Sequence, residues 1–89
     1  MTTENREFSV CQFFEDESYE YVRRFVSAQE AIEAFQFYTH NVSSSMGLTR
    51  RVILTDSGDV INMEWKYGEG IVYPTKEMIK EWDIKEPKS

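Results

Sequence analysis

The chain has 89 residues and a formal net charge of −6, so it has room for one domain with one hydrophobic core. Its six Phe, five Tyr and two Trp residues supply apolar area for that core, and its single cysteine excludes an internal disulfide bond. The negative charge argues against non-specific attraction to nucleic-acid backbones, and no stretch approaches the ~18 apolar residues of a membrane span.

A β-hairpin is predicted near the N-terminus, after a frayed arm at residues 1–6. Residues 8–14 read as the first strand, but apolar side chains occur at both of its alternating positions. This pattern predicts either partial cover on both faces or a bulge near Gln12. Residues 19–26 form the second strand, neither face of which is cleanly apolar, and the polar turn at 16–18 joins the two strands.

A capping box begins the one long helix of the chain. In Ser27-Ala28-Gln29-Glu30, the Ser27 hydroxyl is expected to accept a hydrogen bond from the Glu30 N–H, while the Glu30 carboxylate accepts one from the Ser27 N–H. Apolar residues then recur at spacings of three and four as far as Met46, which predicts a helix with one buried stripe. The stripe consists of Ala31, Ile32, Phe35, Tyr38, Val42 and Met46.

Gly47 is expected to end this helix, because a residue in the left-handed conformation commonly follows the last turn and glycine adopts it without strain. In such a Schellman cap, Leu48 folds back on Val42. The three serines at 43–45 have modest helix propensity, so we expect the last turn to be loose.

A second hairpin is the clearest local prediction. Residues 51–55 and 60–67 read as strands joined by the tight turn Asp56-Ser57-Gly58-Asp59. Alternation along the second strand separates an apolar face from a polar face. The apolar face consists of Ile61, Met63, Trp65 and Tyr67, and the polar face of Asn62, Glu64 and Lys66.

The end of the chain is expected to add a short strand and a short helix. The turn Gly68-Glu69-Gly70 is followed by a strand at residues 71–73, and Pro74 ends that strand. Thr75 is placed to cap a short helix, followed by a charged tail at 84–89 that we expect to be flexible. The helix would carry Met78, Ile79 and Trp82 inward.

The order strand, strand, helix, strand, strand predicts a single α+β domain over residues 1–89, with flexible ends at 1–6 and 84–89. An antiparallel sheet of four or five strands is expected to carry the long helix on one face, with a short C-terminal helix or tail appended. One helix covers only part of such a sheet. Its other face is then solvated, covered by the C-terminal segment or used in a dimer.

No grouping of side chains points to catalysis, a metal or a cofactor. His40 is the only histidine, and no nucleophile or carboxylate close to it in sequence favours a catalytic role over a surface position. Cys11 lies between apolar neighbours, which favours a buried structural thiol. The turn at 56–59 lacks the roughly twelve-residue ligand spacing of a calcium loop, and the Gly-x-Gly at 68–70 is too short for a dinucleotide fingerprint.

Two features remain as candidate binding sites. Phe37 lies on the helix side opposite the apolar stripe, where a large exposed side chain is either an ordinary surface residue or a contact for a partner. The dipeptides Arg23-Arg24 and Arg50-Arg51 would form an anion-binding cluster if their strands lay close together, although ordinary ion pairs with glutamates are favoured. The candidate binding residues are Arg23, Arg24, Arg50, Arg51, Phe37 and His40.

The first functional hypothesis is a non-enzymatic, acidic, cytoplasmic protein-interaction module, either monomeric or a homodimer through the uncovered sheet face or an edge strand. A small-molecule or anion-binding domain built on the arginine pairs is the first alternative. An acidic mimic of nucleic acid is the second, whereas direct nucleic-acid binding and membrane insertion are not expected. The run of residues 49–65 resembles small bacterial or phage proteins in general and implies no residue roles.

Overall fold

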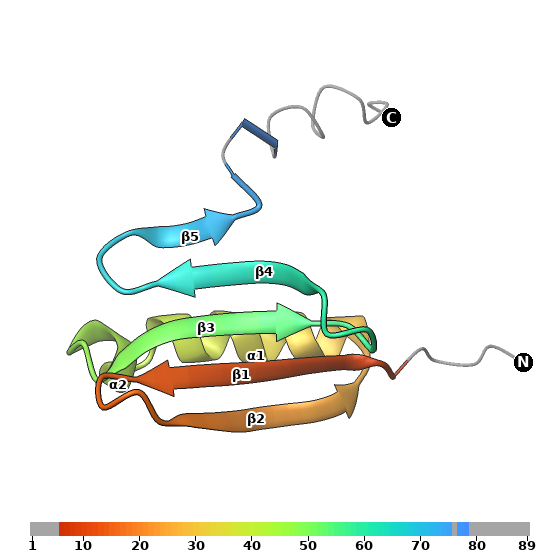
Figure 1. Cartoon of the computed structure of the whole chain (residues 1–89), viewed down its shortest axis with the longest axis horizontal. Coiled ribbons are helices and arrows are strands. Elements are labelled where there is room, and N and C mark those ends of the chain that lie inside the picture. Colours follow the sequence, from red (N-terminus) through yellow and green to blue (C-terminus); the bar gives the residue numbers. More distant parts are fainter. Residues whose placement is uncertain (1–5, 76, 79–89) are drawn as a thin grey trace, which may run out of the picture.

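The computed structural model describes residues 6–75, 77 and 78. Within them, a five-stranded antiparallel sheet carries the helix α1 on one face (Figure 1), which confirms the predicted α+β class. The elements follow the order β1 (Phe8–Phe14), β2 (Tyr19–Val26), α1 (Ala28–His40), α2 (Val42–Ser45), β3 (Thr49–Thr55), β4 (Ile61–Lys66) and β5 (Gly70–Tyr73).

The strand order in the sheet is β2-β1-β3-β4-β5. Helix α1 packs on β2, β1 and β3, and in Figure 1 the strands β4 and β5 lie to one side of it. Residues paired across neighbouring strands point to the same side of a sheet, so the register defines its two faces. We call the side turned away from α1 the open face. Successive sets of residues paired across β1, β3 and β4 alternate between the two sides. The set Val10, Leu54 and Met63 points to α1, and the next set, Cys11, Ile53 and Glu64, points to the open face.

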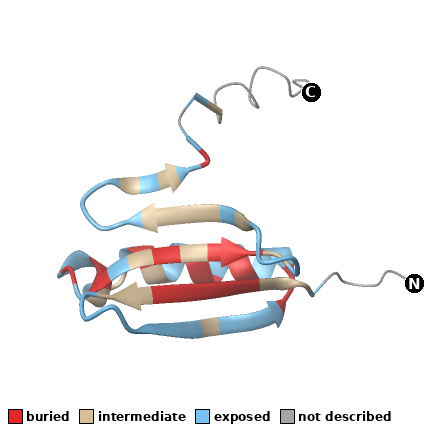
Figure 2. Cartoon of the chain, viewed as in Figure 1, coloured by how far each residue is buried: buried red, intermediate tan, exposed pale blue. Residues whose placement is uncertain are grey.

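The hydrophobic core lies between α1 and the strands that it covers (Figure 2). Phe35 is 1% exposed and is the largest fully buried side chain. In β1, four successive residues, 9–12, are buried, so the first of the two readings of its pattern, cover on both faces, is confirmed. The buried apolar cluster consists of Val10, Val26, Ala31, Ala34, Phe35, Val52 and Leu54.

The irregularity of the first hairpin originates in β2. Gln12 itself pairs with Glu20 and Val52, but register shifts flank it: one between Val10 and Cys11 in the pairing with β2, and one between Phe13 and Phe14 in the pairing with β3. The irregularity predicted near Gln12 is therefore present, with the extra residues in β2 and β3 rather than in β1. Opposite the two-residue step from Phe8 to Val10, β2 takes three residues, which is a β-bulge. Phe25 lies in this bulge with φ +56°, and its N–H donates to the Ser9 hydroxyl over 3.3 Å. A second extra residue of β2 lies opposite the step from Val10 to Cys11, and the two together explain why neither face of β2 has a clean alternation.

The predicted start of α1 is confirmed at Ser27. Its hydroxyl accepts a hydrogen bond from the Glu30 N–H over 3.2 Å. The Glu30 carboxylate, which was expected to reach back to Ser27, pairs instead with Arg6, whose Nη2 lies 3.3 Å from Glu30 Oε1. One half of the capping box therefore forms, and the other half is replaced by an exposed ion pair.

The prediction of one helix as far as Met46 is wrong, because α1 ends at His40. Asn41 has an extended backbone, with φ −82° and ψ −179°, and its side chain accepts from the Ser44 N–H over 2.9 Å. The Ser44 and Ser45 hydroxyls donate to the Asn41 carbonyl oxygen over 2.9 and 3.0 Å. These local bonds give the backbone partners outside a continuous helix, so Asn41 starts the short helix α2.

The buried stripe of the helix is correspondingly shorter than predicted. Ala31 and Phe35 are buried and Tyr38 is half-buried, as expected. The other three members of the predicted stripe are exposed: Ile32, Val42 and Met46. The buried side of α1 consists of Ala31, Ala34, Phe35 and Thr39.

The Schellman cap predicted at Gly47 forms at the end of α2. The Leu48 N–H donates to the Ser43 carbonyl oxygen over 3.0 Å, and the Gly47 N–H donates to that of Ser44 over 3.4 Å. Gly47 has φ +85°. The Leu48 and Val42 side chains, which were expected to contact each other, are both exposed.

Replacing Gly47 by alanine is expected to lower the free energy of unfolding by about 1–2 kcal/mol. An L-residue is strained at this φ, and the added Cβ would lie 3.0 Å from Tyr67 Cζ. Urea unfolding followed by tryptophan fluorescence measures the change. Gly68→Ala is the matched control, because Gly68 has φ +84° but an added Cβ there meets no atom within 4 Å. Equal losses in both variants would show that the Tyr67 contact contributes nothing.

The apolar face predicted for residues 60–67 is confirmed only in its middle. A register shift in β4 places Ile61 opposite Thr55 and therefore on the open face. Tyr67 lies beyond β4 and is exposed. The two central residues pack against the core while remaining half-buried: Met63 and Trp65.

Strand β5 ends at Tyr73, before Pro74, as predicted. The Thr75 hydroxyl accepts from the Met78 N–H over 3.2 Å, which is the N-cap bond expected for the short C-terminal helix. The other predictions for that helix and for the two chain ends concern residues outside the described part: Ile79, Trp82, the tail 84–89 and all of the arm except Arg6. Of the described helices, none combines the length and apolar character needed to cross a membrane.

Candidate functional site

The arginine dipeptides do not meet in one cluster, because β1 lies between β2 and β3. Arg23 is paired with Val10 and therefore points to the side of α1. Arg24 points to the open face, where its guanidinium carbon lies 4.6 Å from the centre of the Tyr21 ring. Because Arg23 lies beside residues of α1 and Arg24 lies beside Tyr21, this dipeptide is divided between the two sides of the sheet.

The arginines of β3 are engaged in ion pairs of the kind that the sequence favoured. Arg50 Nη2 lies 3.4 Å from Glu15 Oε1 in an exposed pair. Arg51 Nε lies 2.6 Å from Glu64 Oε2, and both of these side chains are half-buried. The second pair fixes the orientation of the Arg51 guanidinium on the open face.

A continuous run of rings and guanidiniums crosses the open face. The Phe13 and Tyr19 rings are 5.8 Å apart, and the Tyr19 and Tyr21 rings are 6.1 Å apart in an edge-to-face arrangement. Arg24 extends the run from Tyr21 to the Phe25 ring, 5.4 Å away, and at the other end Arg51 lies 4.9 Å from the Phe13 ring. We call this set the arginine–aromatic run: Phe25, Arg24, Tyr21, Tyr19, Phe13 and Arg51.

Much of the arginine–aromatic run is accessible to solvent. Tyr19 is 62% exposed, Phe25 60% and Tyr21 44%. On the same face, Cys11 is buried, and this burial raises the pKa of its thiol above the ordinary value. The predicted structural thiol is thus confirmed as buried, and the exposed surface around it consists of rings that can contact a partner.

The open face is locally basic although the chain as a whole is acidic. In the described strands it carries three cations, Arg24, Arg51 and Lys66, and one carboxylate, Glu64. The formal net charge of the chain is −6. The acidic side chains are therefore concentrated outside this face, and the two sides of the sheet offer different electrostatic surroundings.

Both guanidiniums of the arginine–aromatic run keep donor groups available. Within the described part of the chain, the Arg24 side chain makes no hydrogen bond, and the Arg51 side chain uses only its Nε. Stacking against rings restrains the plane of a guanidinium while leaving its N–H edge exposed. The geometry therefore suits the binding of carboxylate or phosphate oxygens at two separate points.

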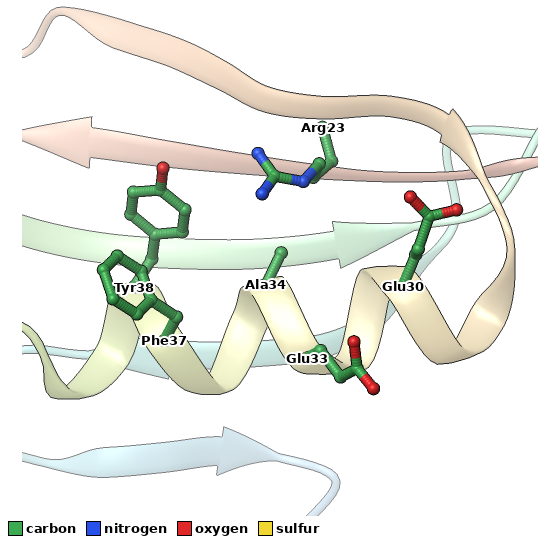
Figure 3. A pocket seen from close by; sticks show the side chains of 6 residues that line it. All are labelled: Arg23, Glu30, Glu33, Ala34, Phe37 and Tyr38. Carbon is green, nitrogen blue, oxygen red and sulfur yellow. The ribbon is translucent and has the colours of Figure 1, made fainter.

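Phe37, the aromatic residue predicted to lie outside the core, is 60% exposed and lines a groove between α1 and β2 (Figure 3). Its ring contacts Tyr38 edge-on, with 5.0 Å between the centroids. The groove has a volume of about 370 Å³ and brings Phe37 together with a second candidate residue, Arg23. It is lined by Arg23, Glu30, Glu33, Ala34, Phe37 and Tyr38.

His40 is exposed at the end of α1 and is not among the residues of the groove. Its Nδ1 lies 2.8 Å from the Gln36 carbonyl oxygen and 3.1 Å from the Thr39 hydroxyl. Both partners belong to its own helix. The Thr39 hydroxyl also donates to the Gln36 carbonyl oxygen over 3.1 Å, so all three groups belong to the hydrogen bonding of the last turn of α1.

The aspartates in the two turns accept hydrogen bonds from groups of their own turns. Asp56 Oδ1 accepts from the N–H groups of Gly58 and Val60 over 2.9 and 3.1 Å, and the bond from Val60 is the largest cause that lowers the pKa of Asp56. Asp16, in the turn at the opposite end of the sheet, has its pKa lowered chiefly by the Ser18 hydroxyl. In the described residues no group of three His, Cys, Asp or Glu side chains is arranged to hold a metal ion.

The arginine–aromatic run was not predicted from the sequence. Tyr19 and Tyr21 have the same parity in β2, which was a usable signal for a shared face. The contribution of Phe13 depends on the register of the hairpin, because Phe13 pairs with Tyr19. That register is displaced farther along by the bulge at Phe25, which the residue pattern does not reveal.

Comparison with known proteins gives no family for the chain. A scan against family models finds no match, and searches of curated proteins and of solved structures find none at a significant level. The open face and the groove are therefore the features of the chain that indicate a function.

Proposed function

We propose that the chain is a non-enzymatic protein-interaction module whose contact surface is the open face of the sheet. The observation that supports this proposal best is the arginine–aromatic run. Tyr, Phe and Arg are enriched in protein interfaces, and Tyr and Arg in particular dominate their energetic centres. Here they project from paired strands, so their ordering on binding costs little additional conformational entropy.

The exposed area of the run suits the centre of an interface. A ring buries roughly 150–250 Å² when it is fully packed, so the half-exposed Tyr19, Tyr21 and Phe25 rings offer roughly 300 Å² together. A standard interface buries about 800 Å² on each partner. The three rings would therefore supply more than a third of one side, and the surrounding strand residues would form the rim.

Affinity capture from the native host, with matched variants, tests this proposal. We expect the chain to retain a specific protein and the double variant Tyr19→Ser/Tyr21→Ser to lose it. Phe37→Ser is the control, because it removes an aromatic side chain of similar exposure from the groove instead of the open face. Circular dichroism establishes that both variants are folded. Undiminished retention by the double variant would contradict the proposal.

A second copy of the chain is one partner that the proposal allows. Face-to-face pairing would bring Arg24, Arg51 and Lys66 of two copies together, and like charges across an interface are unfavourable. We therefore favour a different protein as partner. Light scattering distinguishes the two: a mass near 10.6 kDa corresponds to a monomer, and twice that mass to a homodimer.

Anion or small-molecule binding in the groove is the second candidate function. It is favoured by Arg23, whose one hydrogen bond within the described part is donated to the carbonyl oxygen of Val22, its own neighbour, over 2.7 Å. A thermal-shift screen with nucleotides, phosphates and carboxylates tests it, because a ligand that binds the folded state raises the unfolding temperature. A shift abolished by Arg23→Gln would support this function, and no shift from any of these compounds would exclude it.

A further inference from the structure

We propose that the open face recognises an acidic segment of a protein partner, with Arg24 and Arg51 binding carboxylates at its two ends. This inference rests on the proposed function and specifies the chemistry of the partner. Its basis is the contrast between the open face, with three cations and one carboxylate in its strands, and a chain of net charge −6. Electrostatic complementarity of this kind selects the partner and orients it.

Arg24 is oriented for carboxylate binding before any partner arrives. Its guanidinium carbon lies 4.6 Å from the centre of the Tyr21 ring and 5.4 Å from that of Phe25. These contacts restrain the side chain, and among the described residues no hydrogen bond involves its guanidinium N–H groups. A planar fork held in this way binds a carboxylate in two-point geometry with little further loss of side-chain entropy.

Arg51 provides a second carboxylate-binding side chain on the same face. The bond from its Nε to Glu64 and the contact with the Phe13 ring fix its guanidinium plane. Its two terminal nitrogens donate to no described residue. Because Glu64 neutralises part of its charge, Arg51 is the weaker of the two anion contacts, and Arg24 is the better residue to substitute in a test.

The register sets the spacing of the two contacts. Arg51 is paired with Phe13, whereas Arg24 lies between the pairs that β2 forms with Val10 and Phe8. Along β1, the backbone positions of Arg24 and Arg51 are about 13 Å apart, and across the sheet β2 is about 10 Å from β3. The two backbone positions are therefore about 16 Å apart. This distance corresponds to about five residues of an extended chain.

The rings between the two arginines favour a peptide with apolar residues in its middle. Tyr19 and Tyr21 both project from β2 beside this path and are exposed. A single-stranded nucleic acid also stacks on rings, but such sites follow the phosphate backbone with a basic groove. Among the strand residues that the structure describes, the open face has only Lys66 in addition to its two arginines, and the acidic side chains elsewhere in the chain repel phosphates. An acidic protein segment therefore fits better.

NMR titration of the isotope-labelled full chain tests the inference. The probe is a synthetic capped peptide with two glutamates about five positions apart and leucine and valine between them. We expect saturable shifts of amides in β1, β2 and β3, and a weaker response to the same peptide with glutamines. Arg24→Gln is expected to weaken binding about three- to tenfold. Arg23→Gln is the matched control, because it removes the same charge from the adjacent residue on the opposite face.

Three results would overturn the inference: equal weakening by the two arginine variants, equal binding of the glutamine peptide, or tighter binding of single-stranded oligothymidylate. Absence of shifts on the open face at millimolar peptide would overturn it as well. If a captured partner is lost with Tyr19→Ser/Tyr21→Ser but retained by Arg24→Gln, the open face is a protein-binding surface, and the preference for an acidic segment is refuted. Retention by all of these variants would refute both.

Discussion

Replacing Phe35 by alanine is expected to lower the free energy of unfolding by about 3–5 kcal/mol. Phe35 is 1% exposed and packs with apolar residues of α1, β1, β2 and β3, so its removal leaves a cavity at the centre of the core. A chain of this length has a total stability of roughly 5–13 kcal/mol. The variant is therefore expected to be close to unfolding at ambient temperature, which urea titration followed by tryptophan fluorescence would show.

Phe37→Ala is the matched control for this prediction. It makes the same chemical change two residues farther along α1, but the Phe37 ring is 60% exposed, so we expect a loss of only about 0.5 kcal/mol or less. Equal losses at the two positions would contradict the assignment of the core. Trp65→Ala is expected to cost less than Phe35→Ala, about 2 kcal/mol, because Trp65 is only half-buried.

The bounds of β1 and β2 could be predicted from the sequence, whereas the interruption of the helix could not. Apolar residues bounded by polar turns are local signals, and they placed both strands correctly. The apolar spacing of three and four continues past His40, so it predicted a helix as far as Met46. Asn41 ends α1 through side-chain bonds to its own neighbours, and such bonds compete with the helix without disturbing the periodicity.

For the candidate site, it was easier to predict which side chains are exposed than which side chains lie close together. Phe37 was correctly placed outside the core by its position on the helix wheel. The separation of the arginine dipeptides follows from β1 lying between β2 and β3, which depends on the path of the chain after α1. The division of Arg23 from Arg24 was accessible in principle, because adjacent strand residues point to opposite faces. The arginine–aromatic run depends on register and on a bulge, which are tertiary properties.

Replacing Thr49 by valine is expected to lower the free energy of unfolding by about 1–3 kcal/mol, although valine has nearly the same shape. Thr49 is fully buried, and its hydroxyl donates to Gln12 Oε1 over 3.1 Å and lies 2.9 Å from the Ser43 hydroxyl. Gln12 Nε2 in turn donates to Glu20 over 3.1 Å. Valine would leave the buried Gln12 oxygen without this partner, and that desolvation cost exceeds the gain in apolar contact.

Thr55→Val separates this effect from the simple loss of a hydroxyl. Thr55 is also buried in β3, but among the described residues its side chain has no hydrogen-bond partner, so we expect a change within about 0.5 kcal/mol. The Thr49 network further joins α2 to β1 through Ser43. Thr49→Val should therefore accelerate hydrogen exchange at the Ser45 and Met46 amides, which close α2, while Thr55→Val leaves them unchanged. Unchanged exchange in Thr49→Val would show that the Asn41 cap and the Gly47 turn hold α2 without the network.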